Sequence, residues 1–140
     1  MEFTAHFQII SKKHSYTIVH SNAMYYICCM NNEFVQNWFS QVKKGTLSYI
    51  ILIILDEKEY YGYELVQEIK IHTTLEVAEG TLYPLLNRLK TEGIVESKWV
   101  EQESGIPRKY YTLSVNGKAT LTEMKKIWSA LNTAINKIEK

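Results

Sequence analysis

The side chains best suited to bind a partner molecule gather in residues 78–92 of this 140-residue chain. Leucines recur there at helical spacing, and the positions outside the leucine stripe carry an amide, hydroxyls and cations: Thr81, Tyr83, Asn87, Arg88 and Lys90. An asparagine amide can pair with an adenine edge, whereas hydroxyls and cations can hydrogen-bond to phosphates. The pattern is compatible with a helix that contacts DNA, and it is equally typical of an ordinary solvated amphipathic helix.

A second group of cations lies beside a polar turn. Residues 94–100 and 108–113 have the composition of two short strands, and the polar segment between them predicts a β-hairpin. Three cations on these strands are suited to phosphate or minor-groove contact: Lys98, Arg108 and Lys109. Glutamates in the turn dilute this charge, so a solvated loop explains the hairpin equally well when it is taken alone.

Helical segments must support both groups. Apolar residues at spacings of three and four predict a short amphipathic helix over 32–44. The isoleucine-rich run 45–58 has the composition of a buried strand, but its length favours a second helix. A turn at 61–63 precedes another helix that ends near His72.

The helix over 78–92 has the clearest boundaries. Gly93 is expected to end it in a left-handed conformation. Pro84 is expected near its first turn, because a proline there removes no hydrogen bond that the helix would otherwise make.

The last segment predicts a helix that needs a partner. Ser114 is a candidate N-cap. Apolar residues then alternate at spacings of three and four, which is typical of a coiled-coil seam: Leu121, Met124, Trp128, Leu131, Ile135 and Ile138. Three helices and a hairpin already supply a core, so we expect this stripe to be buried against a second copy of the chain.

The order of these elements predicts a fold class that is mainly α with a small β-hairpin. We expect a winged helix-turn-helix domain over 31–113 and a C-terminal dimerisation helix over 114–140, preceded by an extension of uncertain origin over 1–30.

The sequence resembles the PadR-like family of transcriptional regulators from about Gly45 to Trp128. Four blocks in the same order carry the resemblance: KGTL at 44–47, YGYEL at 61–65, EGTLYPLLNRL at 79–89 and GIPRKYYTL at 105–113.

The resemblance implies a cytosolic repressor that binds a palindromic operator in double-stranded DNA as a homodimer. The recognition helix would be 78–92, and the wing would be 94–113. Tyr63 joins the side chains named above as a DNA-binding candidate. The resemblance also implies a small aromatic or toxic effector, for which Trp128 is the candidate contact, although tryptophan on a seam is more often core filling.

Composition excludes several classes of protein. No apolar run is long enough to cross a membrane, and no secretory signal is recognisable, so we expect a cytoplasmic protein. Phosphate-binding loops, nucleophile elbows and paired metal-ligand motifs are all missing, so no enzymatic activity, cofactor or metal is expected. The net charge of only +1 gives DNA binding no support from composition.

Two alternatives remain open. A winged-helix module that binds protein without specific DNA binding would suit the neutral charge of the 78–113 region. A redox or metal sensor would use the adjacent pair Cys28 and Cys29, which fit no standard zinc spacing and cannot easily form a disulfide with each other.

Overall fold

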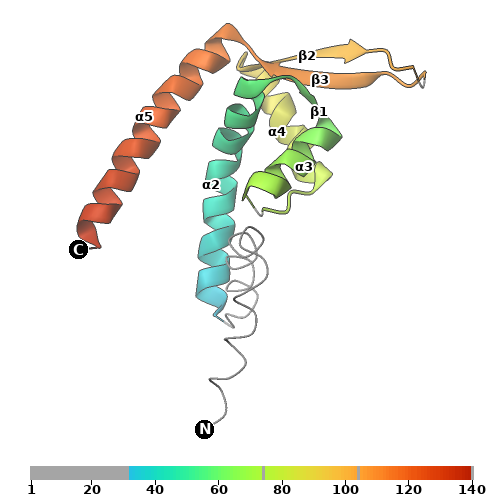
Figure 1. The fold of residues 1–140 in the computed structure, drawn as a ribbon. Helices are drawn as coiled ribbons and strands as arrows, with labels where there is room; N and C mark the ends of the chain where they lie inside the picture. The colour runs from blue at the N-terminus through green and yellow to red at the C-terminus, as the bar shows by residue number, and fades with distance from the viewer. Residues whose placement is uncertain (1–31, 74, 104, 140) are drawn as a thin grey trace, which may run out of the picture. The chain divides into compact units, whose positions relative to one another are not determined.

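The computed structural model describes residues 32–139 except 74 and 104. The described elements are α2 (Glu33–Glu57), β1 (Tyr60–Tyr61), α3 (Gly62–Thr73), α4 (Glu79–Thr91), β2 (Val95–Val100), β3 (Arg108–Leu113) and α5 (Val115–Ile138) (Figure 1). The chain divides into two compact units, 1–41 and 42–140. In the first unit the described residues form the start of α2, where Phe34 and Trp38 are exposed. The paired cysteines lie outside the described residues.

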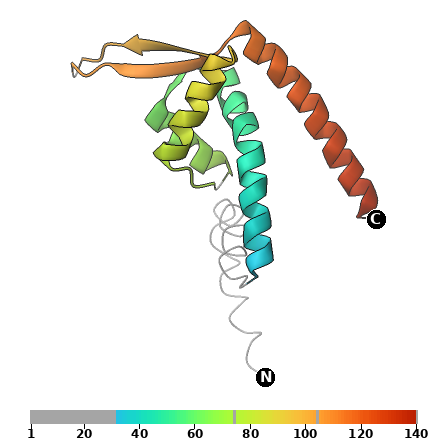
Figure 2. The ribbon, with the colours of Figure 1, turned by 180° about the vertical axis from the view of Figure 1, so that it is seen from behind.

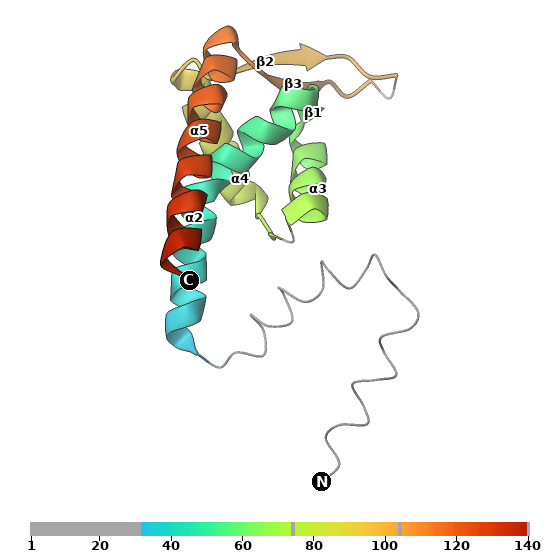
Figure 3. The ribbon, with the colours of Figure 1, turned by 60° about the vertical axis from the view of Figure 1, so that its left-hand side comes forward.

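The second unit has the predicted fold class: helices with a small antiparallel sheet whose strand order is β1-β3-β2. Figures 1, 2 and 3 show α3 and α4 on the same side of that sheet. The core is formed by aliphatic side chains that are fully buried on each helix and on β2, including Ile51, Leu52, Leu65, Ile69, Leu82, Leu86 and Val95. Burial of these side chains supplies the main driving force for folding.

The first two predicted helices are one. A single helix, α2, runs through Gly45, where we expected a boundary. Glycine costs a helix interior roughly 0.5–1 kcal/mol relative to alanine but does not stop it. The buried side chains of Leu47 and Ile51 follow directly, and their packing outweighs the local preference.

Pro84 lies inside α4 rather than in its first turn, so that prediction was wrong. The missing proline N–H would have bonded to the carbonyl of Gly80, four residues earlier. Gly80 is exposed, so water can satisfy that carbonyl. The end of α4 is as predicted: Gly93 has φ 70°, and the N–H of Ile94 donates to the Leu89 carbonyl at 2.9 Å.

The hairpin matches the predicted wing, and β1 adds a third strand that the sequence did not suggest. Strand β3 pairs with β2 over the full length of both, with Lys98 opposite Tyr110 and Trp99 opposite Lys109. On its other edge it pairs with β1, with Tyr61 opposite Tyr110. A two-residue strand carries too little alternation to stand out in a sequence.

Ser114 joins the end of β3 to α4 and α5. Its hydroxyl donates to the carbonyl of Gly93 at 2.6 Å and accepts from the N–H of Gly117 at 2.9 Å, which makes it the predicted N-cap of α5. Gly117 is required beside it, because a Cβ there would overlap the Ile94 carbonyl. The start of α5 is therefore attached directly to the turn that ends α4.

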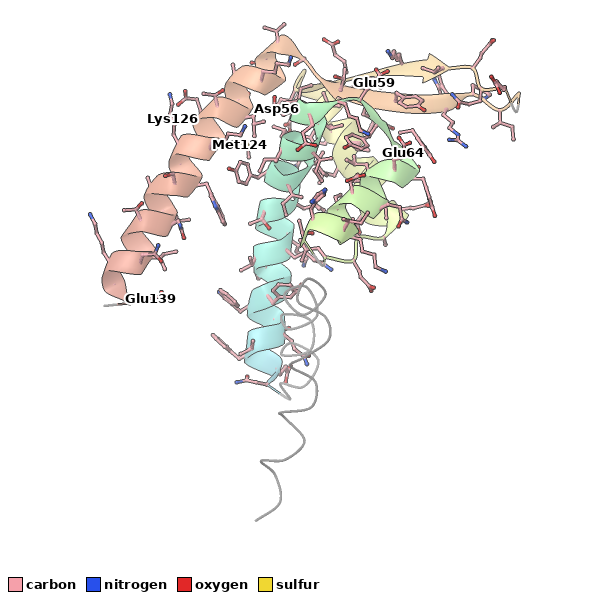
Figure 4. All side chains as sticks on the ribbon, in the orientation of Figure 1. Asp56, Glu59, Glu64, Met124, Lys126 and Glu139 are labelled. Carbon is pink, nitrogen blue, oxygen red and sulfur yellow. The ribbon has the colours of Figure 1, made fainter. Side chains whose placement is uncertain are left out.

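Beyond its first turns, α5 lies beside the C-terminal half of α2. Lys125 forms an ion pair with Asp56 at 3.2 Å, and the rings of Tyr49 and Trp128 lie 5.7 Å apart. In Figure 4, Asp56 and Met124 lie in the space between the two helices, whereas Lys126 lies on the far side of α5.

Replacing Ser114 with alanine should destabilise the fold by about 1–3 kcal/mol, because α5 loses its cap and the part-buried hydrogen bond to the Gly93 carbonyl is lost. Urea unfolding followed by circular dichroism measures this free energy. Ser129→Ala, at an exposed position of the same helix, should change it by less than about 0.5 kcal/mol. Equal stabilities for the two variants would contradict the role given to Ser114.

Candidate nucleic-acid interface

Helix α4 presents four different surfaces around its axis: an inner one, an outward one and two flanks. The inner surface buries Leu82, Leu86 and Leu89. At 100° per residue, the opposite, outward surface carries Gly80, Pro84, Asn87 and Thr91, all of them exposed. Asn87 is thus the candidate whose side chain is best placed to meet a base edge. Tyr83 and Lys90 lie on one flank of the helix, and Thr81 and Arg88 lie on the other.

Two of the predicted contact residues, Arg108 and Tyr63, lie against the Tyr61 ring. The Arg108 guanidinium lies 4.5 Å from the centre of the Tyr61 ring. Tyr63, at the start of α3, stacks on the same ring with centroids 6.3 Å apart. Lys98 shares a face of the sheet with Tyr110, whose ring meets Tyr61 edge-on at 5.7 Å. We call Tyr61, Tyr63, Tyr110 and Arg108 the tyrosine cluster.

The tyrosine cluster fixes the direction of Arg108. A guanidinium held over an aromatic ring is attracted by the ring electrons and loses little side-chain entropy when it binds an anion. Lys98 is less available, because its ammonium forms an ion pair with Glu59 at 2.7 Å. Arg108 is therefore the strongest candidate for a phosphate contact on the wing.

Lys109 lies on the opposite face of the hairpin from Arg108. Successive side chains of a strand alternate between faces, so Lys109 shares its face with Tyr111. Its ammonium lies 5.6 Å from the Tyr111 ring and 6.0 Å from the ring of the exposed Trp99. The structure does not bring the three wing cations into one patch.

Tyr83 packs between α3 and the sheet. A Cβ on Gly62 would lie 2.5 Å from the Tyr83 hydroxyl, so the ring occupies the space that the glycine leaves. Burial raises the pKa of the Tyr111 hydroxyl, and the nearby Tyr83 raises it further. Tyr83 is 42% exposed, so it can both hold α4 in place and offer its edge to a ligand.

Arg88 and Thr81 face away from the wing. Arg88 donates to the Ser48 hydroxyl on α2 at 3.3 Å and lies 3.6 Å from the Glu92 carboxylate. Both residues line a hollow of about 480 Å³ that also contains Lys43 and Lys44 of α2. Sequence reasoning did not select these two lysines as contacts, although Lys44 begins the KGTL block, because nothing in the sequence places the end of that predicted helix beside residues 78–92.

The site has the arrangement of a winged helix: an exposed helix face with Arg108 of the wing on one side and a cationic hollow on the other. The sequence model of the family described as "Transcriptional regulator PadR-like family" matches residues 51–123. The chain belongs to the PadR-like family. Members of this family are DNA-binding transcriptional regulators, and the match includes α3, α4 and the whole wing.

Individual relatives agree with the family assignment. A PadR-like regulator from Bacillus cereus is 36% identical, with a TM-score of 0.66 over 71% of this chain and 97% of that one. One from Eggerthella lenta is 30% identical, with a TM-score of 0.66 over 77% of this chain and 94% of that one. A Mycobacterium tuberculosis transcriptional regulator is 39% identical over 48% of this chain and 61% of its own length. An uncharacterised Lysinibacillus sphaericus protein is 36% identical over 69% of this chain and 91% of its own length.

Two features of other protein classes are missing from the described residues. None of the helices in 32–139 is long and apolar enough to cross a membrane. Within the same described range, no three histidine, cysteine, aspartate or glutamate side chains are grouped in a way that could hold a metal ion.

Gly62→Ala should displace Tyr83 and destabilise the fold by about 1–3 kcal/mol, because the new methyl group overlaps the ring. Thermal or urea unfolding measures the change. Gly80→Ala is the matched control, since a Cβ there meets nothing within 4 Å and alanine favours the helix.

The double variant Gly62→Ala/Tyr83→Leu separates this overlap from a loss of glycine flexibility. If the ring is the obstacle, the smaller leucine should return part of the lost stability. A double variant that is less stable than Gly62→Ala alone would contradict the packing described for Tyr83.

Proposed function

We propose that this chain is a cytoplasmic, sequence-specific transcriptional repressor without catalytic activity that binds a palindromic operator as a homodimer. The observation that supports this most strongly is the outward face of α4, which is exposed and bordered by cations on both flanks. A helix in the major groove meets base edges with its outward face and the phosphate chains with its flanks. Asn87 would contact a base, and Arg108 would contact phosphate.

The homodimer is supported by the exposed apolar stripe of α5. Leu121 is buried within its own chain, whereas four seam residues remain about half exposed or more: Trp128, Leu131, Ile135 and Ile138. A continuous apolar stripe on a solvent-facing helix marks an interaction surface. A second copy would cover it and would place a second α4 for the other half of a palindrome.

Relief by a small aromatic effector is the part of the proposal that depends on Trp128. The Trp128 ring is 46% exposed beside Tyr49, so a planar compound could stack against it. Titration with planar aromatic compounds, followed by tryptophan fluorescence, tests this part. Unchanged fluorescence and unchanged DNA affinity with every compound would remove the effector from the proposal.

A winged-helix module that binds protein is the second candidate, and the charge of the site favours it. Residues 78–113 contain five cations, Arg88, Lys90, Lys98, Arg108 and Lys109, and five carboxylates, Glu79, Glu92, Glu96, Glu101 and Glu103. DNA binding therefore depends on the positions of individual cations rather than on a general positive field.

DNA binding should be visible as a mobility shift of the duplex upstream of the chain's own gene, with affinity that falls steeply between two salt concentrations. Arg108→Ala should weaken binding several-fold and lower the salt slope. Lys137→Ala, which removes the same charge near the end of α5, is the control. Binding without sequence preference, or no binding, would favour the protein-binding module instead.

The homodimer should dissociate when a charge is placed on the stripe. Leu131→Glu buries a carboxylate in the proposed interface, so sedimentation should show the mass of one chain, 16.4 kDa. Ser129→Glu adds the same charge at an exposed position about 160° away around the helix and should leave the dimer intact. A monomeric wild-type chain would contradict the dimer directly.

A further inference from the structure

A cationic hollow lies between α2 and α4, on the flank of α4 that carries Thr81 and Arg88. Its lining is partly apolar, with Leu47, Val77 and Leu85 among the residues that form it. The polar part of the lining consists of three cations, two hydroxyls and one carboxylate: Lys43, Lys44, Arg88, Ser48, Thr81 and Glu76. All of them belong to the second unit of the chain. Its charged lining, with cations in excess of carboxylates by two, is suited to an anion.

The contacts inside the hollow hold two of its cations in place. The Lys43 ammonium donates to the backbone carbonyl of Glu76 at 3.0 Å, which leaves two of its three donors for a ligand. Arg88 is held by Ser48 and Glu92. Lys44 is exposed at the edge of the hollow. Positioned cations bind an anion at a smaller entropic cost than freely moving ones.

The position of the hollow indicates which anion it would meet. A helix with its side chains is about 10–12 Å wide and nearly fills a major groove about 12 Å wide. Both flanks of α4 would therefore face a phosphate chain. The Tyr83 flank lies toward the wing, which supplies Arg108, while the Thr81 flank borders the hollow.

We propose that the hollow binds a backbone phosphate of the same duplex, through Lys43 and Lys44 with the Thr81 hydroxyl beside them. This inference rests on the proposed DNA binding. It adds a contact from α2, on the side of the recognition helix opposite the wing. Such a contact fixes the position of α4 in the groove without reading sequence.

Replacing one lysine of the hollow should weaken the binding of every duplex by the same factor. For Lys44→Gln we expect a several-fold loss of affinity for the operator and for a shuffled duplex of equal length. Each phosphate interaction that the substitution removes should lower the slope of log affinity against log salt by about 0.9, hence by roughly 2 in a dimer. Fluorescence anisotropy over a salt series measures both quantities.

Three comparisons make the test decisive. Lys44→Arg keeps the charge and should retain the wild-type affinity and slope, whereas Lys137→Gln removes a distant charge and should change neither. Lys43→Gln/Lys44→Gln should lower the slope further than Lys44→Gln alone. Thermal unfolding of each variant checks that the fold is retained.

The two proposals fail in different ways. If the wild-type chain does not prefer its operator, the DNA-binding function fails whatever the variants do. If the wild type binds its operator and Lys44→Gln matches it in affinity and salt slope, only the phosphate site is overturned. A weakening confined to the operator duplex would also overturn it, because a phosphate contact strengthens the binding of all sequences alike.

Discussion

The hydrogen bonds of one serine hold the functional parts of this chain together. The Ser114 hydroxyl reaches the Gly93 carbonyl at the end of α4 and caps α5, while the Ser114 N–H donates to Ile94, just before β2. The proposed recognition helix, the base of the wing and the proposed dimer helix therefore meet at one side chain. Serine can act in this way because its hydroxyl donates and accepts at once.

Much of the fold can be predicted from the sequence because its signals are local. Gly93 ends α4 since glycine adopts positive φ without steric cost, and Ser114 caps α5 since its side chain reaches the free N–H of Gly117. The predictions that failed depend on tertiary packing. Burial of Leu47 and Ile51 carries α2 through Gly45. Pro84 is tolerated inside α4 because the Gly80 carbonyl, which loses its helical hydrogen bond, belongs to an exposed residue.

The candidate site was predicted as a set of residues, but not as an arrangement. Strand alternation separates Lys109 from Arg108, and only the pairing of β3 with β1 brings Tyr61 under the guanidinium. Tyr83 could not be recognised as a packing residue, because the space that it fills is left by Gly62 in a different helix. Lys43 and Lys44 lie beside residues of α4 only because α2 and α4 pack together in the folded chain, and the sequence does not show that packing.

In the proposed complex, two copies of α4 lie in successive major grooves of one operator. Hydroxyl-radical footprinting of the duplex upstream of the chain's own gene tests this arrangement most directly. We predict two protected segments related by the symmetry of a palindrome, with centres about 10–10.5 base pairs or a multiple of that distance apart. A single protected segment, or uniform protection along the duplex, would contradict the arrangement.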